Sequence, residues 1–225
     1  MSRECAKLLG VAVHELRNPI SVIAGYARML GEDRTGAAPG RQRQLIRDIQ
    51  TSTRELVDLI SELSDLANLE SGSAVINRQE VAVGDLLKQV AALPARENAP
   101  VVELKSEPGE VTIEGDPVRL RAAFTAILST LRTNAADGDK VIIEHAVRRH
   151  AGRPFLTVMA GSEAAVRALA ERRPRSLVRF SVSGGRGAIA SLVACEVIRA
   201  HGGQVWMRRR QRRPRNALID LPLMI

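Results

Sequence analysis

Aromatic residues and cysteines are both scarce in this 225-residue chain, and each shortage excludes a class of protein. Trp, Tyr and Phe make up 2% of the residues, so aliphatic side chains must fill the core, and few rings are present on which nucleic-acid bases could stack. Cys5 and Cys195 are too few and too far apart for a disulfide framework or a metal site. No apolar run is long enough to span a membrane, and the first residues lack the layout of a signal peptide. We therefore expect a soluble, cytoplasmic protein of one or two domains that holds no metal.

The positive charge is concentrated in the later part of the chain. Residues 1–73 contain nine Lys and Arg against ten Asp and Glu, so the net charge of +8 comes from the residues that follow. Its densest run consists of Arg208, Arg209, Arg210, Arg212, Arg213 and Arg215. Such a run can bind nucleic acid, acidic lipid or an acidic protein face, but no nucleic-acid-binding motif accompanies it. We interpret it as the solvated tip of a hairpin and expect no nucleic-acid partner.

Two long stretches near the N-terminus have the periodicity of amphipathic helices. Apolar residues recur at alternating steps of four and three, which predicts a helix over residues 3–30, a loop over 31–41 and a second helix through residue 67. The first seam is Leu9, Val13, Leu16, Ile20, Ile23, Ala27 and Leu30, and the second is Ile46, Ile49, Thr53, Leu56, Ile60, Leu63 and Ala67. One helical hairpin cannot bury both seams. We therefore expect a homodimer, in which a second copy completes a four-helix bundle.

His14 stands two positions from Leu16 and therefore points away from the seam of the first helix. An imidazole on a rigid helix and open to solvent can be a nucleophile or a proton carrier. The adjacent Glu15 could orient the ring and raise the basicity of the attacking nitrogen. A lone surface histidine is more often without function, so its neighbours decide the interpretation.

Residues 14–19 read His-Glu-Leu-Arg-Asn-Pro. This hexapeptide resembles the H-box of bacterial sensor histidine kinases and matches every position of that pattern. The resemblance implies that His14 is a phospho-acceptor and that the hairpin is a dimerisation and phosphotransfer domain. Glu15 and Asn18 resemble the pair that gives such proteins a phosphatase mode, in which the amide orients water for attack on the aspartyl phosphate of a receiver.

The composition changes after the second helix, at a stretch of small polar residues. We place a hairpin domain at 1–70, a linker at 71–80 and a mixed α/β domain at 81–225. Within the last we expect helices at 81–93, 117–131, 162–175 and 188–203, strands at 101–107, 111–116, 140–149 and 153–161, a strand or loop base at 177–185, and a terminal hairpin from 204. This order resembles the ATP-binding domain of histidine kinases. The predicted fold is therefore α+β and multidomain, with a helical hairpin followed by an α/β sandwich of the histidine kinase ATPase type.

Three features that the ATP chemistry of this family needs are missing. Thr130 stands where the family has a magnesium-binding asparagine, Ala126 lies one turn earlier, and Asn134 is expected beyond the helix end. Residues 160–164 (Ala-Gly-Ser-Glu-Ala) lack the aspartate that binds the adenine amino group. Residues 187–191 (Gly-Ala-Ile-Ala-Ser) carry alanines where a glycine-rich turn would meet phosphate. Each lost polar contact costs about 1–3 kcal/mol, so we expect no ATP, no magnesium and no other cofactor.

The sequence thus predicts a two-component signalling protein that keeps the phospho-acceptor and cannot phosphorylate it from ATP. We expect a histidine phosphotransferase, or a receiver phosphatase, acting through His14, Glu15 and Asn18. Its partners would be the receiver domain of a response regulator and a partner histidine kinase. The alternatives are a pseudokinase scaffold without chemistry at His14 and a divergent kinase that is still active.

Overall fold

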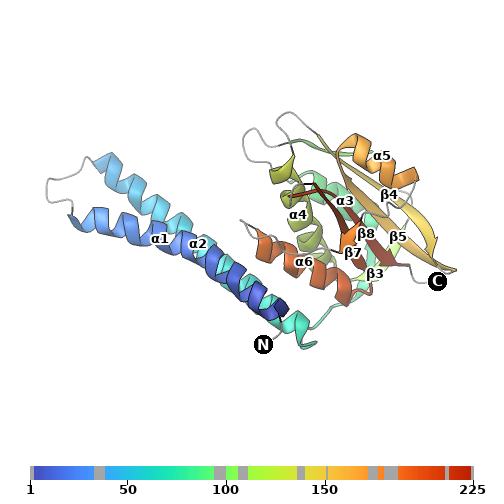
Figure 1. Cartoon of the computed structure of the whole chain (residues 1–225), viewed down its shortest axis with the longest axis horizontal. Coiled ribbons are helices and arrows are strands. Elements are labelled where there is room, and N and C mark those ends of the chain that lie inside the picture. Colours follow the sequence, from blue (N-terminus) through green and yellow to red (C-terminus); the bar gives the residue numbers. More distant parts are fainter. Residues whose placement is uncertain are drawn as a thin grey trace.

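A computed structural model describes the chain over residues 3–32, 39–93, 100–105, 111–135, 140–150, 152–171, 177–179, 187–210 and 213–223. A long helical hairpin projects from an α/β domain, and α6 lies beside the open end of the hairpin (Figure 1). The hairpin consists of α1 (Arg3–Glu32) and α2 (Pro39–Glu70), which confirms both predicted helices. The predicted loop at 31–41 is too long, because α2 begins at Pro39, and proline suits the first turn of a helix. Residues 33–38 of that loop lie outside the described residues.

The two helices bury only part of their apolar residues against each other. Leu45 and Leu66 are 8% and 1% exposed, whereas Val13, Ile20 and Ile60 are 49%, 50% and 55% exposed. These three belong to the predicted seams. A stripe of aliphatic side chains on the hairpin is therefore exposed to solvent in the monomer.

The α/β domain contains two sheets. A small antiparallel pair is formed by β1 (Gln79–Ala82) and β3 (Thr112–Gly115). The main sheet has the order β2 (Val102–Leu104), β4 (Val141–His150), β5 (Arg153–Gly161), β8 (Arg213–Pro222), β7 (Gln204–Arg210) and β6 (Val178–Arg179). Only the β2–β4 pair is parallel among the described pairings. The four predicted strands and the terminal hairpin are confirmed, with shorter limits for the first two.

Helices cover both faces of the main sheet. Neighbouring strand residues alternate between two cores: Ile143 and Val158 pack in the larger one, and Ile142 and Met159 in the smaller one. The larger core is covered by α3 (Val83–Ala91), α4 (Pro117–Asn134) and α6 (Ala188–Ala200), and the smaller one by α5 (Glu163–Glu171). Two expectations were wrong in detail. Residues 81–82 are in β1 because they pair with β3, and Asn134 is the last residue of α4.

The segment that leaves the hairpin, residues 71–78, is bonded to the α/β domain. The backbone N–H of Asn77 donates to Asp116 Oδ2 at 3.2 Å, and Arg78 Nη2 donates to the carbonyl of Ala200 at 2.9 Å. Asp116 also caps α4 by accepting from the N–H groups of its first turn. One carboxylate therefore ties the connecting segment to a helix of the second domain.

His201 is a second fixed point of this junction. Its Nε2 accepts from the N–H of Asp116 at 2.9 Å and its Nδ1 lies 2.7 Å from the carbonyl of Val197, so the ring is neutral with its proton on Nδ1. Burial lowers the pKa of His201, which favours this neutral form. Gly115 leaves room for the ring, because a Cβ there would lie 2.9 Å from His201 Cδ2.

The predicted basic tip lies at the turn between β7 and β8. Arg215 is exposed; residues 211 and 212, and the side chains of 208–214, lie outside the described residues. Across the described part of the chain, no helix has the length and apolarity needed to cross a membrane.

Candidate functional site

His14 lies on the exposed side of α1, as its place relative to the seam predicted. Asn18 follows one turn later, is also exposed, and shares the same helix face because the two residues are four apart. Pro19 is buried inside the helix. A docked partner can therefore reach the imidazole and the amide together from one side.

Glu15, about 100° further around the helix than His14, faces the α/β domain. It is 5% exposed, and its Oε1 accepts the backbone N–H of Ala188, the first residue of α6, at 2.9 Å. The N–H groups of Gly187 and Ile189 also stabilise the charged carboxylate, but burial outweighs them and raises the pKa of Glu15. The predicted contact between Glu15 and His14 is thus replaced here by a hydrogen bond to α6, although the His14 charge still acts on the carboxylate.

Glu62 joins the same site and was not identified from the sequence. It lies on α2, and its Oε2 is buried without a hydrogen-bond partner among the described atoms. Burial, and then the charges of Glu15 and Asp58, raise the pKa of Glu62 to about 7. Two carboxyl groups therefore meet near the N-terminus of α6: Glu15, which is bonded to its backbone amide, and Glu62, whose pKa of about 7 leaves it partly protonated at neutral pH. Asp58, Glu62 and Asp65 recur at helical spacing in the sequence. Their spacing alone does not indicate which of the three is buried.

Thr130, which stands where the resembled family has a magnesium-binding asparagine, makes a contact between two helices. Thr130 on α4 and Ser191 on α6 lie with their hydroxyl oxygens 2.7 Å apart, and the Thr130 hydroxyl also bonds the carbonyl of Ala126 at 3.0 Å. Ser191 is 1% exposed. The two helices that would flank a nucleotide are thus joined directly through small hydroxyl side chains.

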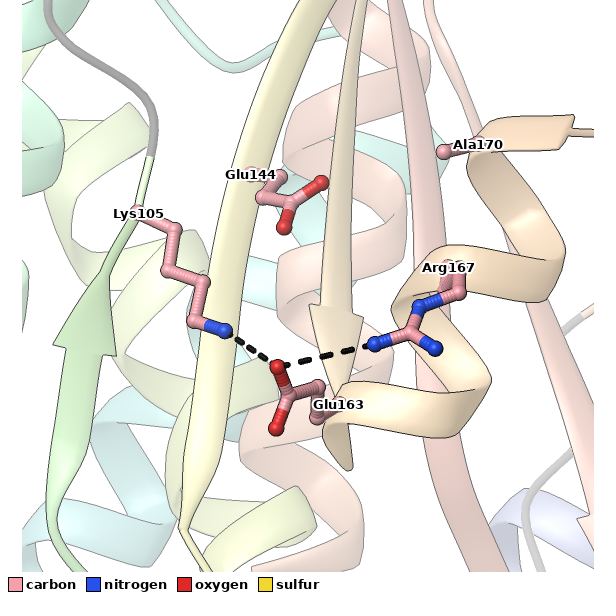
Figure 2. Close-up of a pocket in the computed structure, with 5 residues that line it drawn as sticks. All are labelled: Lys105, Glu144, Glu163, Arg167 and Ala170. Atoms are coloured by element: carbon pink, nitrogen blue, oxygen red, sulfur yellow. Dashed lines mark hydrogen bonds and ion pairs between the residues drawn. The ribbon is translucent and has the colours of Figure 1, made fainter.

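Residues 160–164 do not place a carboxylate in this region. Gly161 ends β5 with φ of 152°, and a Cβ there would lie 2.7 Å from Cβ of Asn216. Glu163 begins α5 on the other side of the sheet, where it bonds Lys105 Nζ at 2.5 Å and pairs with Arg167 at 3.8 Å. Figure 2 shows the three side chains converging in an open pocket that is also lined by Glu144. The carboxylate is neutralised by its two basic neighbours, so this pocket is a surface ion-pair cluster remote from His14.

Comparisons with known proteins agree with the two-part architecture. A family model described as the His Kinase A (phospho-acceptor) domain matches residues 6–72. The cell-division control histidine kinases PdhS of Brucella anthropi and Brucella abortus are each 23% identical over 146 residues, which is 63% of this chain and 14% of those proteins. The chain thus spans only 14% of the length of these relatives.

Solved structures resemble the chain over almost its whole length. Histidine kinase AdeS of Acinetobacter baumannii has a TM-score of 0.57 at 14% identity, covering 93% of this chain and 96% of that one. Histidine kinase ThkA, solved in complex with response regulator protein TrrA, has a TM-score of 0.56 at 16% identity and covers 97% of this chain and 61% of that one. At these identities the likeness shows the fold.

Proposed function

We propose that this chain is a two-component signalling protein of the histidine kinase type and that His14 is a phosphoryl relay. His14 accepts the group from a phosphorylated partner and passes it to the receiver domain of a response regulator. The observation that carries this proposal is the exposed His14 within a matched phospho-acceptor domain. One neighbour in the fold, ThkA, was solved with a response regulator, which supports a receiver as the partner here.

The phosphoryl group is supplied by a partner and not by ATP bound to this chain. Three observations support this part of the proposal. The carboxylate of Glu15 engages the amides at the N-terminus of α6, the Thr130 and Ser191 hydroxyls join α4 to α6, and Ala160 offers no group for an adenine amino group. An ATP phosphate would have to displace this carboxylate, and Thr130 offers only a hydroxyl, already bonded to Ser191 and Ala126, where the magnesium ion would need an amide oxygen.

The transfer itself needs little from this chain beyond position. An unprotonated imidazole nitrogen of His14 attacks the phosphorus of an aspartyl phosphate, the P–O bond to the aspartate breaks, and the aspartate leaves as a carboxylate. Such loose transition states depend on alignment and charge stabilisation, and the receiver domain supplies the metal ion. Return of the phosphoryl group to a second receiver is the same step in reverse.

The same helix face supports a phosphatase mode. Asn18 is exposed one turn from His14, where its amide can orient a water molecule toward the aspartyl phosphate of a docked receiver. Water then replaces the imidazole as the nucleophile, and phosphate is released. Replacement of Asn18 by alanine should slow receiver dephosphorylation and leave transfer to His14 less affected.

We also propose that the protein is a homodimer that forms through the hairpin. Val13, Ile20 and Ile60 leave half of their side-chain surface open, and a second hairpin would cover them in a four-helix bundle. Each dimer would then present two His14 residues on the flanks of the bundle.

The test is transfer of radiolabelled phosphate in mixtures with candidate kinases and receivers. Wild-type protein should gain acid-labile label from a phosphorylated partner, and His14→Gln should gain none while keeping its circular dichroism and dimer. Asn18→Gln is a matched control on the same face and should still be labelled. Absence of label from every cognate partner contradicts the relay and leaves a scaffold without chemistry at His14. Labelling by ATP alone shows that the chain is an active kinase.

A further inference from the structure

Strand β4 is longer than β2, its neighbour at the edge of the main sheet. β2 pairs with residues 141–143 only, and just after it the N–H of Lys105 donates to the carbonyl of Ile143 at 3.0 Å. β4 continues to residue 150 and stays paired with β5 on its other side. Among the described residues, no strand lies beside residues 144–150 on the side of β2. This part of β4 is therefore an open edge, which we call the β4 edge.

The backbone groups of the β4 edge continue the row that pairs with β2. Successive residues of a strand direct their N–H and C=O groups to opposite sides, so Val147 and Arg149 direct theirs the same way as Ile143. The groups of Ala146 and Arg148 point instead toward β5. Val147 is 51% exposed, and Arg149 is also exposed. An added strand can therefore bond this edge in the way that β2 bonds the start of β4.

A pocket of about 440 Å³ borders the β4 edge on the face of the sheet that α5 covers. Figure 2 shows Glu144 on β4, with Lys105 on one side of it and Arg167 of α5 on the other. Ala170, near the end of α5, also lines the pocket. Val147 belongs to the opposite face, because it alternates with the residues of β4 that face α5. Side chains of an added strand would lie alternately along the pocket and beside Val147.

The charge around the β4 edge favours an acidic occupant. Among the described side chains, the basic ones are Lys105, Arg148, Arg149 and Arg167, against Glu144 and Glu163. Arg148 donates to the carbonyls of Leu169 and Ala170 at the end of α5, which holds its charge beside the edge. A second copy of the chain presents the same basic edge, so pairing of two copies would bring like charges together. An acidic strand meets opposite charges at the same positions.

We propose that the β4 edge is a docking site for an extended acidic segment of a partner protein, which adds a strand to the main sheet. The backbone of the segment bonds Val147 and Arg149, its acidic side chains lie near the basic ones, and an apolar residue covers Val147. In such complexes the main-chain hydrogen bonds give affinity and alternate side chains give specificity. The site lies on the α/β domain and needs no chemistry at His14, so it holds or fails independently of the relay.

A labelled peptide of alternating glutamate and valine residues is the probe, and its fluorescence anisotropy with the full chain measures binding. We expect a dissociation constant in the micromolar range at low salt. A peptide of the same sequence with a fully N-methylated backbone keeps the charge and loses every N–H donor, and it should bind about tenfold more weakly or not at all. Equal binding of the methylated peptide makes the attraction electrostatic only and overturns the proposal, as does failure of the acidic peptide to bind.

Two variants of the β4 edge test the backbone and the charge separately. Val147→Pro removes an N–H that points away from β5, a position at which an edge strand tolerates proline. Arg149→Glu keeps the backbone and reverses a charge. Each should weaken peptide binding about tenfold, whereas the exposed control sites Val75→Pro and Arg121→Glu should bind like wild type. Should Val147→Pro fail to fold, Arg149→Glu still decides, and equal binding by Arg149→Glu and wild type overturns the proposal.

Hydrogen exchange followed by nuclear magnetic resonance locates the bound peptide. The peptide should slow exchange of the Val147 and Arg149 amides about tenfold and leave those of Ala146 and Arg148, which face β5, unchanged. Unchanged exchange at Val147 and Arg149 in the presence of bound peptide places it elsewhere and overturns the proposal. A wild-type dimer that is lost in a folded Val147→Pro assigns the edge to a second copy and also overturns it. His14→Gln should bind the peptide like wild type, whatever the outcome of the labelling experiments.

Discussion

Replacement of Glu62 by glutamine should change how the stability of the protein depends on pH. The pKa of Glu62 rises from 4.5 in the unfolded chain to about 7 in the folded protein, chiefly because the carboxyl is buried. Between these values the folded state holds a proton that the unfolded state has lost. The free energy of unfolding therefore falls as the pH rises from 4.5 to about 7, and stays lower above it.

The size of the effect follows from the same pKa values. A full change from 4.5 to about 7 corresponds to roughly 3.4 kcal/mol at 1.36 kcal/mol per pH unit. Glu62 is only about half buried, and solvent screens the neighbouring charges, so we expect roughly 1–2 kcal/mol. Glutamine has nearly the same shape and no titrating proton, so it removes this dependence and leaves the packing in place.

Urea denaturation at pH 5, 6, 7 and 8 and one protein concentration measures the difference between wild type and Glu62→Gln. Comparing two variants cancels the titrating groups that do not interact with Glu62, such as His201. The stability of wild type relative to Glu62→Gln should drop by roughly 1–2 kcal/mol between pH 5 and pH 8. Glu70→Gln, at an exposed carboxyl, should follow wild type. Parallel curves for wild type and Glu62→Gln would refute the reasoning that burial keeps this proton on the folded protein.

Three further outcomes test the rest of the structure. Thermal melts should show no upward shift with millimolar Mg-ATP, and a clear shift would mean that the chain binds the nucleotide. Ile60→Lys should place a charge in the open stripe of the hairpin and yield monomers in sedimentation at micromolar concentration, where wild type should be dimeric; a monomeric wild type contradicts the dimer. Gly115→Ala should lower stability by about 1–3 kcal/mol in denaturant melts, because its Cβ would lie 2.7 Å from Leu120 Cδ1 and 2.9 Å from His201 Cδ2. Gly25→Ala, in α1 with open space around it, should not destabilise, and equal losses at both positions would contradict the packing argument.

The two helices of the hairpin and the exposure of His14 were open to prediction because they depend on local order. Apolar residues that recur every three or four positions define one face of a helix within a few turns. A residue two positions away from that face, such as His14, therefore points toward solvent. The strands and the terminal hairpin were predicted from short local runs of residues that favour extended structure. Errors occurred where a distant partner decides: residues 81–82 became a strand by pairing with residues 112–113. The domain boundaries and the roles of His14, Glu15 and Asn18 stay predictions.

Only the tertiary structure decided what surrounds the site. The sequence placed Glu15 beside His14, but its hydrogen-bond partner lies 173 residues away at the N-terminus of α6. The burial of Glu62 depends on which face of α2 meets the second domain, and the bond between Thr130 and Ser191 on how α4 packs against α6. A residue's type and its local spacing determine which contacts it can make. Which of them it makes depends on the long-range packing that brings distant segments together, and a single sequence carries no periodic signal for that packing.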